Sequence, residues 1–176
     1  MDVNKISRGK NCPEEVNVII EIPMNSDPVK YEFDKDSGAI FVDRFMQSAM
    51  HYPCNYGFVP HTLSDDGDPV DVMVIAHYPV VPGAVIACRP IGVLIMEDES
   101  GQDEKIIAVP VAKLDVTFAD IKAMEDIDPM LKARIVHFFE HYKDLEKGKW
   151  VKVTGWADAA KAKSLISEAV ERAEKR

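Results

Sequence analysis

The chain has 176 residues, of which 47% are hydrophobic and 8% aromatic, enough for one ordinary hydrophobic core and too few for two generous ones. We therefore expect a single domain that spans residues 1–176. Thirty acidic side chains against 21 basic ones give a net charge of −9 at pH 7. Such a surface repels nucleic-acid backbones and attracts cations, which argues against non-specific nucleic-acid binding.

Hydropathy and cysteine usage indicate a cytoplasmic protein without a membrane partner. No apolar run approaches the roughly 20 residues that a membrane helix needs, and residues 1–11 are polar where a secretion signal would be hydrophobic. Cys12, Cys54 and Cys88 are odd in number, widely spaced and never in a CxxC pair. They indicate neither a disulfide framework nor a thiolate zinc site, and we expect reduced, buried thiols.

Short β-type runs separated by turn residues fill the chain from Val16 to about Val109. Ser37-Gly38 predicts a tight connection between the second and third runs, whereas Pro90 interrupts a later one. This succession predicts a sheet or a small barrel. The runs are residues 16–22, 29–33, 39–42, 70–76, 84–96 and 105–109.

A change of hydrophobic period after these runs predicts a helix. Asp128 is a good N-cap, Pro129 suits the first helical position, and apolar residues from Leu131 to Leu145 repeat at helical spacing before Gly148 ends the helix. One face of this helix is expected to pack on the barrel.

A further strand over 150–154 and a second helix from about Asp158 complete the predicted elements. The apolar residues of this second helix lie on one face, and residues 171–176 are expected to fray. The segment 115–126 is ambiguous, with a short helix near Ile121 as one interpretation.

The most unusual segment is Asp65-Asp66-Gly67-Asp68-Pro69-Val70-Asp71, which places four carboxylates in seven residues at the entrance to an apolar strand. Like charges this close repel one another unless cations neutralise them. A solvated acidic turn is the plainer interpretation, but Asp71 lies where the strand has already begun. The pattern does not fit an EF-hand, and carboxylates without nearby His or Cys suit Mg²⁺ or Mn²⁺.

Other charged residues fall at strand positions that could face the same site. Alternation in the second run puts Lys30 and Glu32 on one face, Glu21 lies between two isoleucines, and Arg44 ends a strand. The wet face of an antiparallel sheet is the alternative. A second acidic cluster at residues 97–104 resembles, by itself, an exposed hairpin loop.

A competing signal is His137-Phe138-Phe139-Glu140-His141, which matches the HxxEH pattern of inverted zinc proteases on a predicted helix. Short patterns of this kind occur by chance, and no third zinc ligand is indicated. Structural or interface histidines on the flank of the helix are the preferred interpretation.

Taken together, these segments resemble the family I soluble inorganic pyrophosphatases in their compact bacterial form. The likeness lies in residue order and spacing over nearly the whole chain. It is carried by Asp66-Gly67-Asp68-Pro69-Val70-Asp71-Val72, Glu21, Lys30-Tyr31-Glu32, Phe41-Val42-Asp43-Arg44, Tyr52-Pro53-Cys54-Asn55-Tyr56-Gly57, Asp98-Glu99, Asp103, Lys105 and Tyr142-Lys143.

The resemblance implies a fold, an activity and a set of site residues. The fold would be α+β and mainly β, a five-stranded OB-like β-barrel with flanking α-helices, assembled as a homohexamer. The activity would be Mg²⁺-dependent hydrolysis of pyrophosphate to two orthophosphates, with several Mg²⁺ ions per site and Mn²⁺ or Zn²⁺ as possible substitutes. By resemblance the central metal residues are Asp66, Asp71 and Asp103, with Asp98, Glu21 and Glu32 at outlying metal or water positions. The resemblance makes Asp68 the proton acceptor. The residues that it assigns to phosphate contacts are Lys30, Arg44, Tyr56, Lys105, Tyr142 and Lys143.

Two other classes of protein are alternatives to a pyrophosphatase. OB barrels also bind oligonucleotides, but carboxylates in the groove would face the phosphates without metal. A zinc hydrolase using His137 would need stoichiometric zinc. We therefore expect pyrophosphate as the ligand and no nucleic-acid partner.

Overall fold

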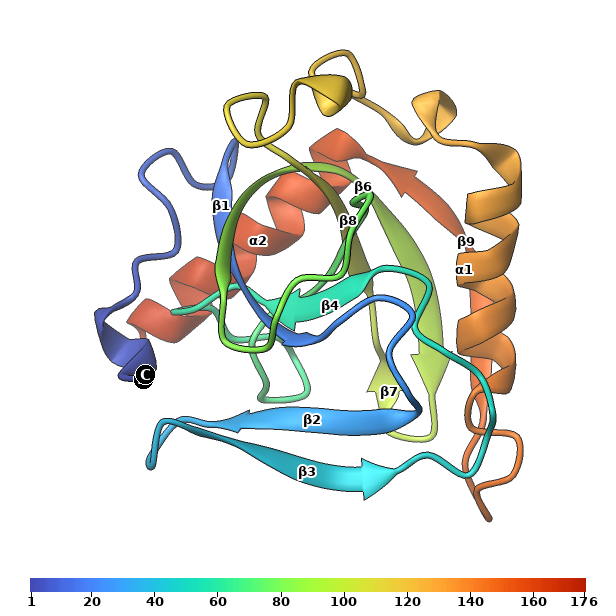
Figure 1. Cartoon of the computed structure of the whole chain (residues 1–176). Coiled ribbons are helices and arrows are strands. Elements are labelled where there is room, and N and C mark those ends of the chain that lie inside the picture. The colour runs from blue at the N-terminus through green and yellow to red at the C-terminus, as the bar shows by residue number, and fades with distance from the viewer.

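The computed structural model describes residues 1–176, and its centre is a closed ring of five strands (Figure 1). Around the ring β1 pairs with β4, β4 with β5, β5 with β8, β8 with β6, and β6 with β1 again. Only the β5–β8 pairing is parallel. The mainly β architecture agrees with the prediction. The strands are β1 (Val16–Ile22), β4 (Asn55–Phe58), β5 (Asp71–Val74), β6 (Val85–Asp98) and β8 (Lys105–Pro110).

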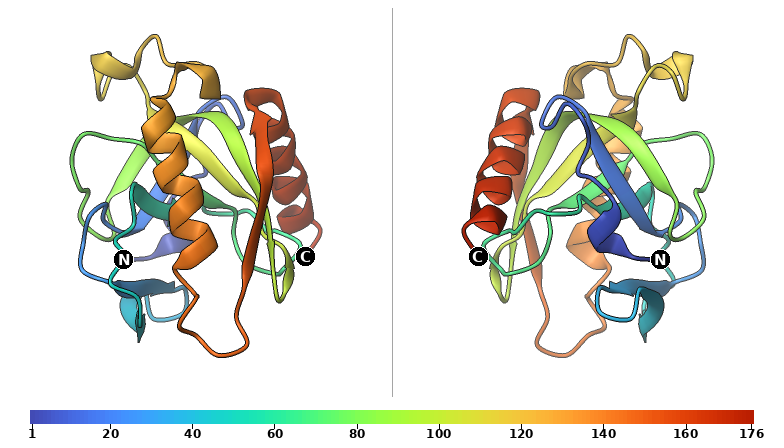
Figure 2. Two further views of the ribbon diagram at one scale, coloured as in Figure 1. Left: turned by 90° about the vertical axis from the view of Figure 1, so that its right-hand side faces the viewer. Right: turned by 90° about the vertical axis from the view of Figure 1, so that its left-hand side faces the viewer.

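Two helices and two further strands surround the ring. The strand β9 (Val151–Asp158) pairs with the outer side of β6, and the short β7 (Gly101–Gln102) pairs with its end. The helices α1 (Pro129–His141) and α2 (Ala159–Glu174) lie on opposite sides of β9 (Figure 2). Aromatic residues of α1 join one buried cluster and small apolar residues of α2 join another, so each helix covers its own part of the barrel.

The strands β2 (Val29–Asp34) and β3 (Ala39–Phe45) form a separate two-stranded sheet, drawn below the barrel in Figure 1. A tight turn that includes Ser37 and Gly38 connects them, as predicted; Gly38 has φ +68° there, which glycine adopts without strain. The strand β3 is longer than expected and includes Arg44. Because Lys30 and Arg44 are cross-strand partners, their side chains leave the same face of the hairpin.

Several predicted boundaries were wrong. The strand β6 continues through Pro90, because a register shift between Pro90 and Gly92 accommodates the residue that lacks an N–H. The segment around Tyr56, which none of the predicted runs includes, is the buried strand β4. The helix α1 ends at His141 rather than before Gly148, and Leu145 is 67% exposed instead of joining the apolar stripe.

The C-terminal part of the chain and the ambiguous segment also differ from expectation. The helix α2 stays ordered to Glu174, so the expected fraying from residue 171 is wrong. The 115–126 segment contains two short 3₁₀ helices, η2 (Val116–Phe118) and η3 (Met124–Asp126), and Ile121 lies between them. A third, η1 (Val3–Lys5), opens the chain.

The state of the three cysteines and the length and hydropathy of the helices can be compared with the predictions. All three thiols are free, and Cys54 and Cys88 are buried as expected, whereas Cys12 is only partly buried. None of the helices is both long enough and apolar enough to cross a membrane.

Candidate active site

One polar cavity of about 330 Å³ gathers most of the predicted site residues at the mouth of the barrel. Six carboxylates and five Lys or Arg side chains line it. The predicted residues brought together are Lys30, Arg44, Tyr56, Asp66, Asp68, Asp71, Asp98, Asp103, Lys105, Tyr142 and Lys143. The cavity also includes residues that were not assigned to the site from the sequence: Tyr52, Glu99, Ser100, Gln102 and Lys149.

Lys105 lies at the centre of this cavity. The parallel pairing of β5 and β8 aligns Val72 with Ile106, so Asp71 and Lys105 begin adjacent strands at the same edge of the sheet. The Lys105 ammonium donates hydrogen bonds to Asp71 Oδ2 at 2.6 Å, Asp103 Oδ1 at 2.5 Å and Tyr56 Oη at 3.3 Å. Burial opposes its charge, but the two carboxylates outweigh burial and hold the Lys105 pKa well above its usual range.

Tyrosine side chains form one wall of the cavity. Tyr52 packs against Tyr56 with ring centroids 5.2 Å apart, and Tyr142 stacks on Phe138 at 4.9 Å. Burial raises the pKa of all three tyrosines above its usual value. Their hydroxyls therefore stay protonated at neutral pH and can donate hydrogen bonds to an anion.

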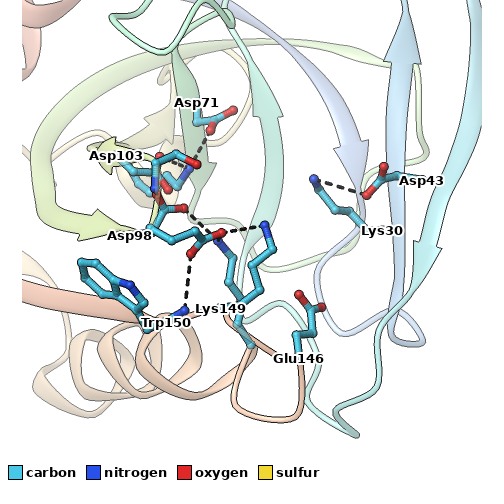
Figure 3. A network of polar contacts seen from close by, with 12 residues as sticks. Lys30, Asp43, Asp71, Asp98, Asp103, Glu146, Lys149 and Trp150 are labelled. Atoms are coloured by element: carbon cyan, nitrogen blue, oxygen red, sulfur yellow. Dashed lines mark hydrogen bonds and ion pairs between the residues drawn. The ribbon is translucent and has the colours of Figure 1, made fainter.

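A second ion-pair network joins the β6–β7 turn to the segment that follows α1 (Figure 3). Lys143 Nζ is 2.8 Å from Asp98 Oδ2, and Lys149 Nζ is 2.7 Å from Glu99 Oε1. Burial opposes ionisation of both acids, but the hydrogen bonds from the lysines prevail, so the pKa of Asp98 is lowered and that of Glu99 falls to about 2. The acidic cluster predicted as an exposed hairpin loop therefore contributes directly to the cavity.

The β2–β3 hairpin supplies two cations. Asp43 Oδ2 lies 3.5 Å from Lys30 Nζ and 3.3 Å from Arg44 Nη1. Arg44 Nε is also 3.1 Å from Glu146 Oε1, an ion pair without hydrogen-bond alignment. Glu146 follows α1 in the chain, and nothing in its local sequence indicated that it would contact the hairpin.

The acidic loop, residues 65–71, is exposed to solvent from Asp65 to Asp68. The Asp68 N–H donates to Asp66 Oδ1 at 3.0 Å, and Gly67 between them has φ +96°, which glycine adopts without strain. Desolvation raises the pKa of Asp66, and neighbouring carboxylates act in the same direction.

Glu21 and Glu32 do not line the main cavity. They lie in an adjoining one of about 170 Å³, which shares Lys30, Tyr56, Asp68 and Asp71 with it. Glu21 is 8% exposed and accepts a 2.8 Å hydrogen bond from the Phe33 N–H. Burial is the main cause that raises the Glu21 pKa to about 7.

The donor chemistry of the cavity fits a hard divalent cation. Its six acidic side chains offer carboxylate oxygens, the ligand atoms that Mg²⁺ and Mn²⁺ prefer. In this conformation no three acidic, His or Cys side chains converge on one point. Two of the carboxylates, Asp71 and Asp103, meet at the Lys105 ammonium, whose single positive charge offsets one of their two negative charges.

The HxxEH residues lie away from this chemistry. The rings of His137 and His141 are 4.7 Å apart on an exposed face of α1, and neither lines the acidic cavity. His137 instead borders a larger cavity of about 530 Å³ beside His51 and Arg134, which lacks carboxylates. That cavity therefore has no donor set for the predicted metal chemistry.

Comparisons with known proteins identify the family. The family model described as inorganic pyrophosphatase matches residues 18–174. A protein named inorganic pyrophosphatase from Rickettsia bellii (strain RML369-C) is 71% identical over 99% of each chain, and one from Salmonella typhimurium (strain LT2) is 60% identical over the full length of both.

Solved structures agree with this result. The inorganic pyrophosphatase of Thermus thermophilus matches with a TM-score of 0.94 and 43% identity over 99% of each chain. A structure from Anaplasma phagocytophilum, described as an inorganic phosphatase, matches with a TM-score of 0.95 and 54% identity over 97% of this chain and 99% of that one. The predicted OB-like fold class and the predicted family are thereby confirmed: the chain belongs to the inorganic pyrophosphatase family.

Proposed function

We propose that this chain hydrolyses inorganic pyrophosphate to two orthophosphates. The single observation that carries the proposal is the cavity in which six carboxylates face five Lys or Arg side chains. Pyrophosphate is a small polyanion, so a nucleophile reaches it only when its charge is neutralised. The names of the relatives support the same activity.

The carboxylates are proposed to hold the metal ions. Asp66, Asp71 and Asp103 are the central set, with Asp98, Glu21 and Glu32 at outlying positions, and Mg²⁺ is the proposed metal with Mn²⁺ or Zn²⁺ as substitutes. When bound, such ions withdraw negative charge from phosphate oxygens and lower the pKa of a coordinated water.

The cationic and phenolic side chains are proposed to hold the substrate. The Arg44 guanidinium can bind two phosphate oxygens at once, and Lys30 projects from the same face of the hairpin. On the barrel side the contacts are Lys105, Lys143, Tyr56 and Tyr142. These groups fix the two phosphoryl groups in line with the attacking water.

Asp68 is proposed as the proton acceptor. Its loop is exposed and lines both cavities, so its carboxylate can reach a water beside the substrate. It takes the proton of the attacking water as the new P–O bond forms, and the leaving phosphate departs with the electrons of the broken P–O bond.

The proposal includes a single pyrophosphatase domain over residues 1–176, a homohexameric assembly and a cytoplasmic location. Mass-resolved light scattering on the purified protein tests the assembly, and a mass other than that of six chains would contradict it.

Phosphate release from pyrophosphate, measured with Mg²⁺ and again with excess EDTA, tests the activity. We expect rapid release with Mg²⁺ and almost none with EDTA. Arg44→Ala should lower kcat/KM by about 10²-fold or more, and Arg44→Lys should recover only part of it, because an ammonium lacks the guanidinium fork. Absence of phosphate release with Mg²⁺ would overturn the proposed function, and normal kinetics of Arg44→Ala would remove Arg44 from the site.

A further inference from the structure

The acidic loop is attached to the C-terminal helix at a point outside the cavity. The Leu63 N–H donates to Ala169 O at 3.0 Å, and Arg172 Nη1 donates back to Leu63 O. Arg172 Nη2 also lies 2.9 Å from Asp65 Oδ1. Helix α2 therefore holds both polar atoms of the Leu63 backbone and the side chain two residues later.

Short hydrogen bonds continue from this attachment to the residues that line the cavity. The Ser64 N–H donates to Asp68 O at 2.7 Å, and the Gly67 N–H donates to Ser64 O at 3.1 Å. The Asp68 N–H then donates to Asp66 Oδ1. The position of Leu63 is thus transmitted through backbone contacts to the carboxylates of Asp66 and Asp68.

The helix is a firm support for such an attachment. Ala162, Ile166 and Ala169 of α2 are at most 2% exposed and belong to the core under the barrel. Near its end, Glu174 Oε1 accepts a 2.7 Å hydrogen bond from Arg8. In contrast, Asp65, Asp66, Gly67 and Asp68 are exposed and have little packing of their own. The attachment to α2 is therefore a main constraint on their position.

We propose that Arg172 is a positioning residue that holds the acidic loop so that Asp66 and Asp68 face the cavity. Arg172 lines neither cavity of the site and acts through Leu63 and Asp65. The inference rests on the proposed function, in which Asp66 is a metal ligand and Asp68 is the proton acceptor. Without the two Arg172 contacts, the hydrogen bond from the Leu63 N–H to Ala169 O alone joins the loop to α2, so the loop samples more conformations, and ordering it again opposes metal binding.

Two measurements on the full-length protein without pyrophosphate test this. Calorimetry with Mg²⁺ should show the Kd of Arg172→Met raised about tenfold, the lower end of the range for residues that orient metal ligands. Amide hydrogen exchange should become faster at residues 63–68 and remain unchanged in β5 and β8. Arg172→Lys, which keeps the charge but not the two-armed contact, should give a smaller change in the same direction.

Lys175→Met is the matched control, because Lys175 is exposed on the same helix end and only pairs with Glu171 at 3.7 Å. It should behave as the unsubstituted protein in both measurements. At saturating Mg²⁺ the bound ions order the loop again, Asp68 included, so Arg172→Met should retain nearly normal kcat; a kcat that stays low would contradict an effect through loop order. Unchanged loop exchange in Arg172→Met would overturn the inference whether or not Mg²⁺ binds. If instead the unsubstituted protein bound no Mg²⁺, the metal assignment would fail while the exchange result still decided the role of Arg172.

Discussion

Replacing Lys105 by Met should lower the free energy of unfolding of the metal-free protein. It should leave the free energy of unfolding of the metal-loaded protein almost unchanged. The Lys105 ammonium is the only positive charge within hydrogen-bond distance of both Asp71 and Asp103. Methionine keeps most of the buried stem and removes the charge. In the variant the two carboxylates face each other unpaired until a divalent cation takes the place of the ammonium.

The magnitude follows from the burial of the three groups. Removing one partner of a buried ion pair costs about 3–5 kcal/mol. The Lys105 side chain is 6% exposed, but those of Asp71 and Asp103 are 27% and 16% exposed, so water reaches the carboxylates and the low end applies. We expect a loss of about 3 kcal/mol in EDTA. In the unsubstituted protein Mg²⁺ must displace the ammonium from the two carboxylates, whereas in the variant it binds them directly, so saturating Mg²⁺ should stabilise the variant by about 3 kcal/mol more and offset the loss.

Urea unfolding at one fixed protein concentration, in EDTA and in saturating Mg²⁺, measures the effect. Lys152→Met is the control, since that side chain is 68% exposed and lies 3.6 Å from Glu97. It should change the free energy of unfolding by well under 1 kcal/mol in both conditions. An equal loss for Lys105→Met with and without Mg²⁺ would refute the reasoning, as would a loss in EDTA no larger than that of the control.

Three more predictions concern the carboxylates and the histidines. Asp71→Asn should raise the Mg²⁺ needed for half-maximal activity, whereas Asp68→Asn should lower the maximal rate on the order of 10²–10⁴-fold at saturating Mg²⁺; full recovery of Asp68→Asn by added Mg²⁺ would make Asp68 a ligand instead. Burial raises the Glu21 pKa from 4.5 to about 7. Between pH 4.5 and about 7, Glu21 is therefore protonated in the folded protein and ionised in the unfolded chain. Stability in EDTA should therefore fall as pH rises from about 4.5 to about 7, and Glu21→Gln should remove this part of the dependence in urea unfolding; an unaltered pH profile would argue against it. Combined His137→Ala and His141→Ala should change the assembly seen by light scattering more than kcat, and loss of activity in a fully assembled double variant would contradict that.

The sequence predicted what depends on local pattern. Alternation and turn residues located β1 and the β2–β3 turn, and Asp128-Pro129 placed the start of α1. Boundaries set by tertiary contacts were missed. Nothing local shows that β6 accommodates Pro90 by a register shift, or that the chain leaves the helix at Tyr142.

The same distinction applies to the candidate site. Residue spacing was enough to nominate Asp66, Asp71 and Lys105, which the fold brings to one cavity. The contacts of Glu146 with Arg44 and of Arg172 with the acidic loop join segments more than 100 residues apart. No periodicity or motif records such pairings, so they became visible only in the folded chain.

The separate β2–β3 hairpin means that the cavity is built by two sheets. Most of its carboxylates belong to the barrel strands and the loops that join them, whereas Lys30 and Arg44 stand on a sheet that shares no backbone ladder with the barrel. A change within the hairpin therefore alters the groups that contact the phosphoryl oxygens, and it also reaches the barrel through the hydrogen bond from the Phe33 N–H to Glu21. The spacing between the cationic groups and the carboxylates thus depends on side-chain contacts between two sheets and not on one continuous backbone ladder.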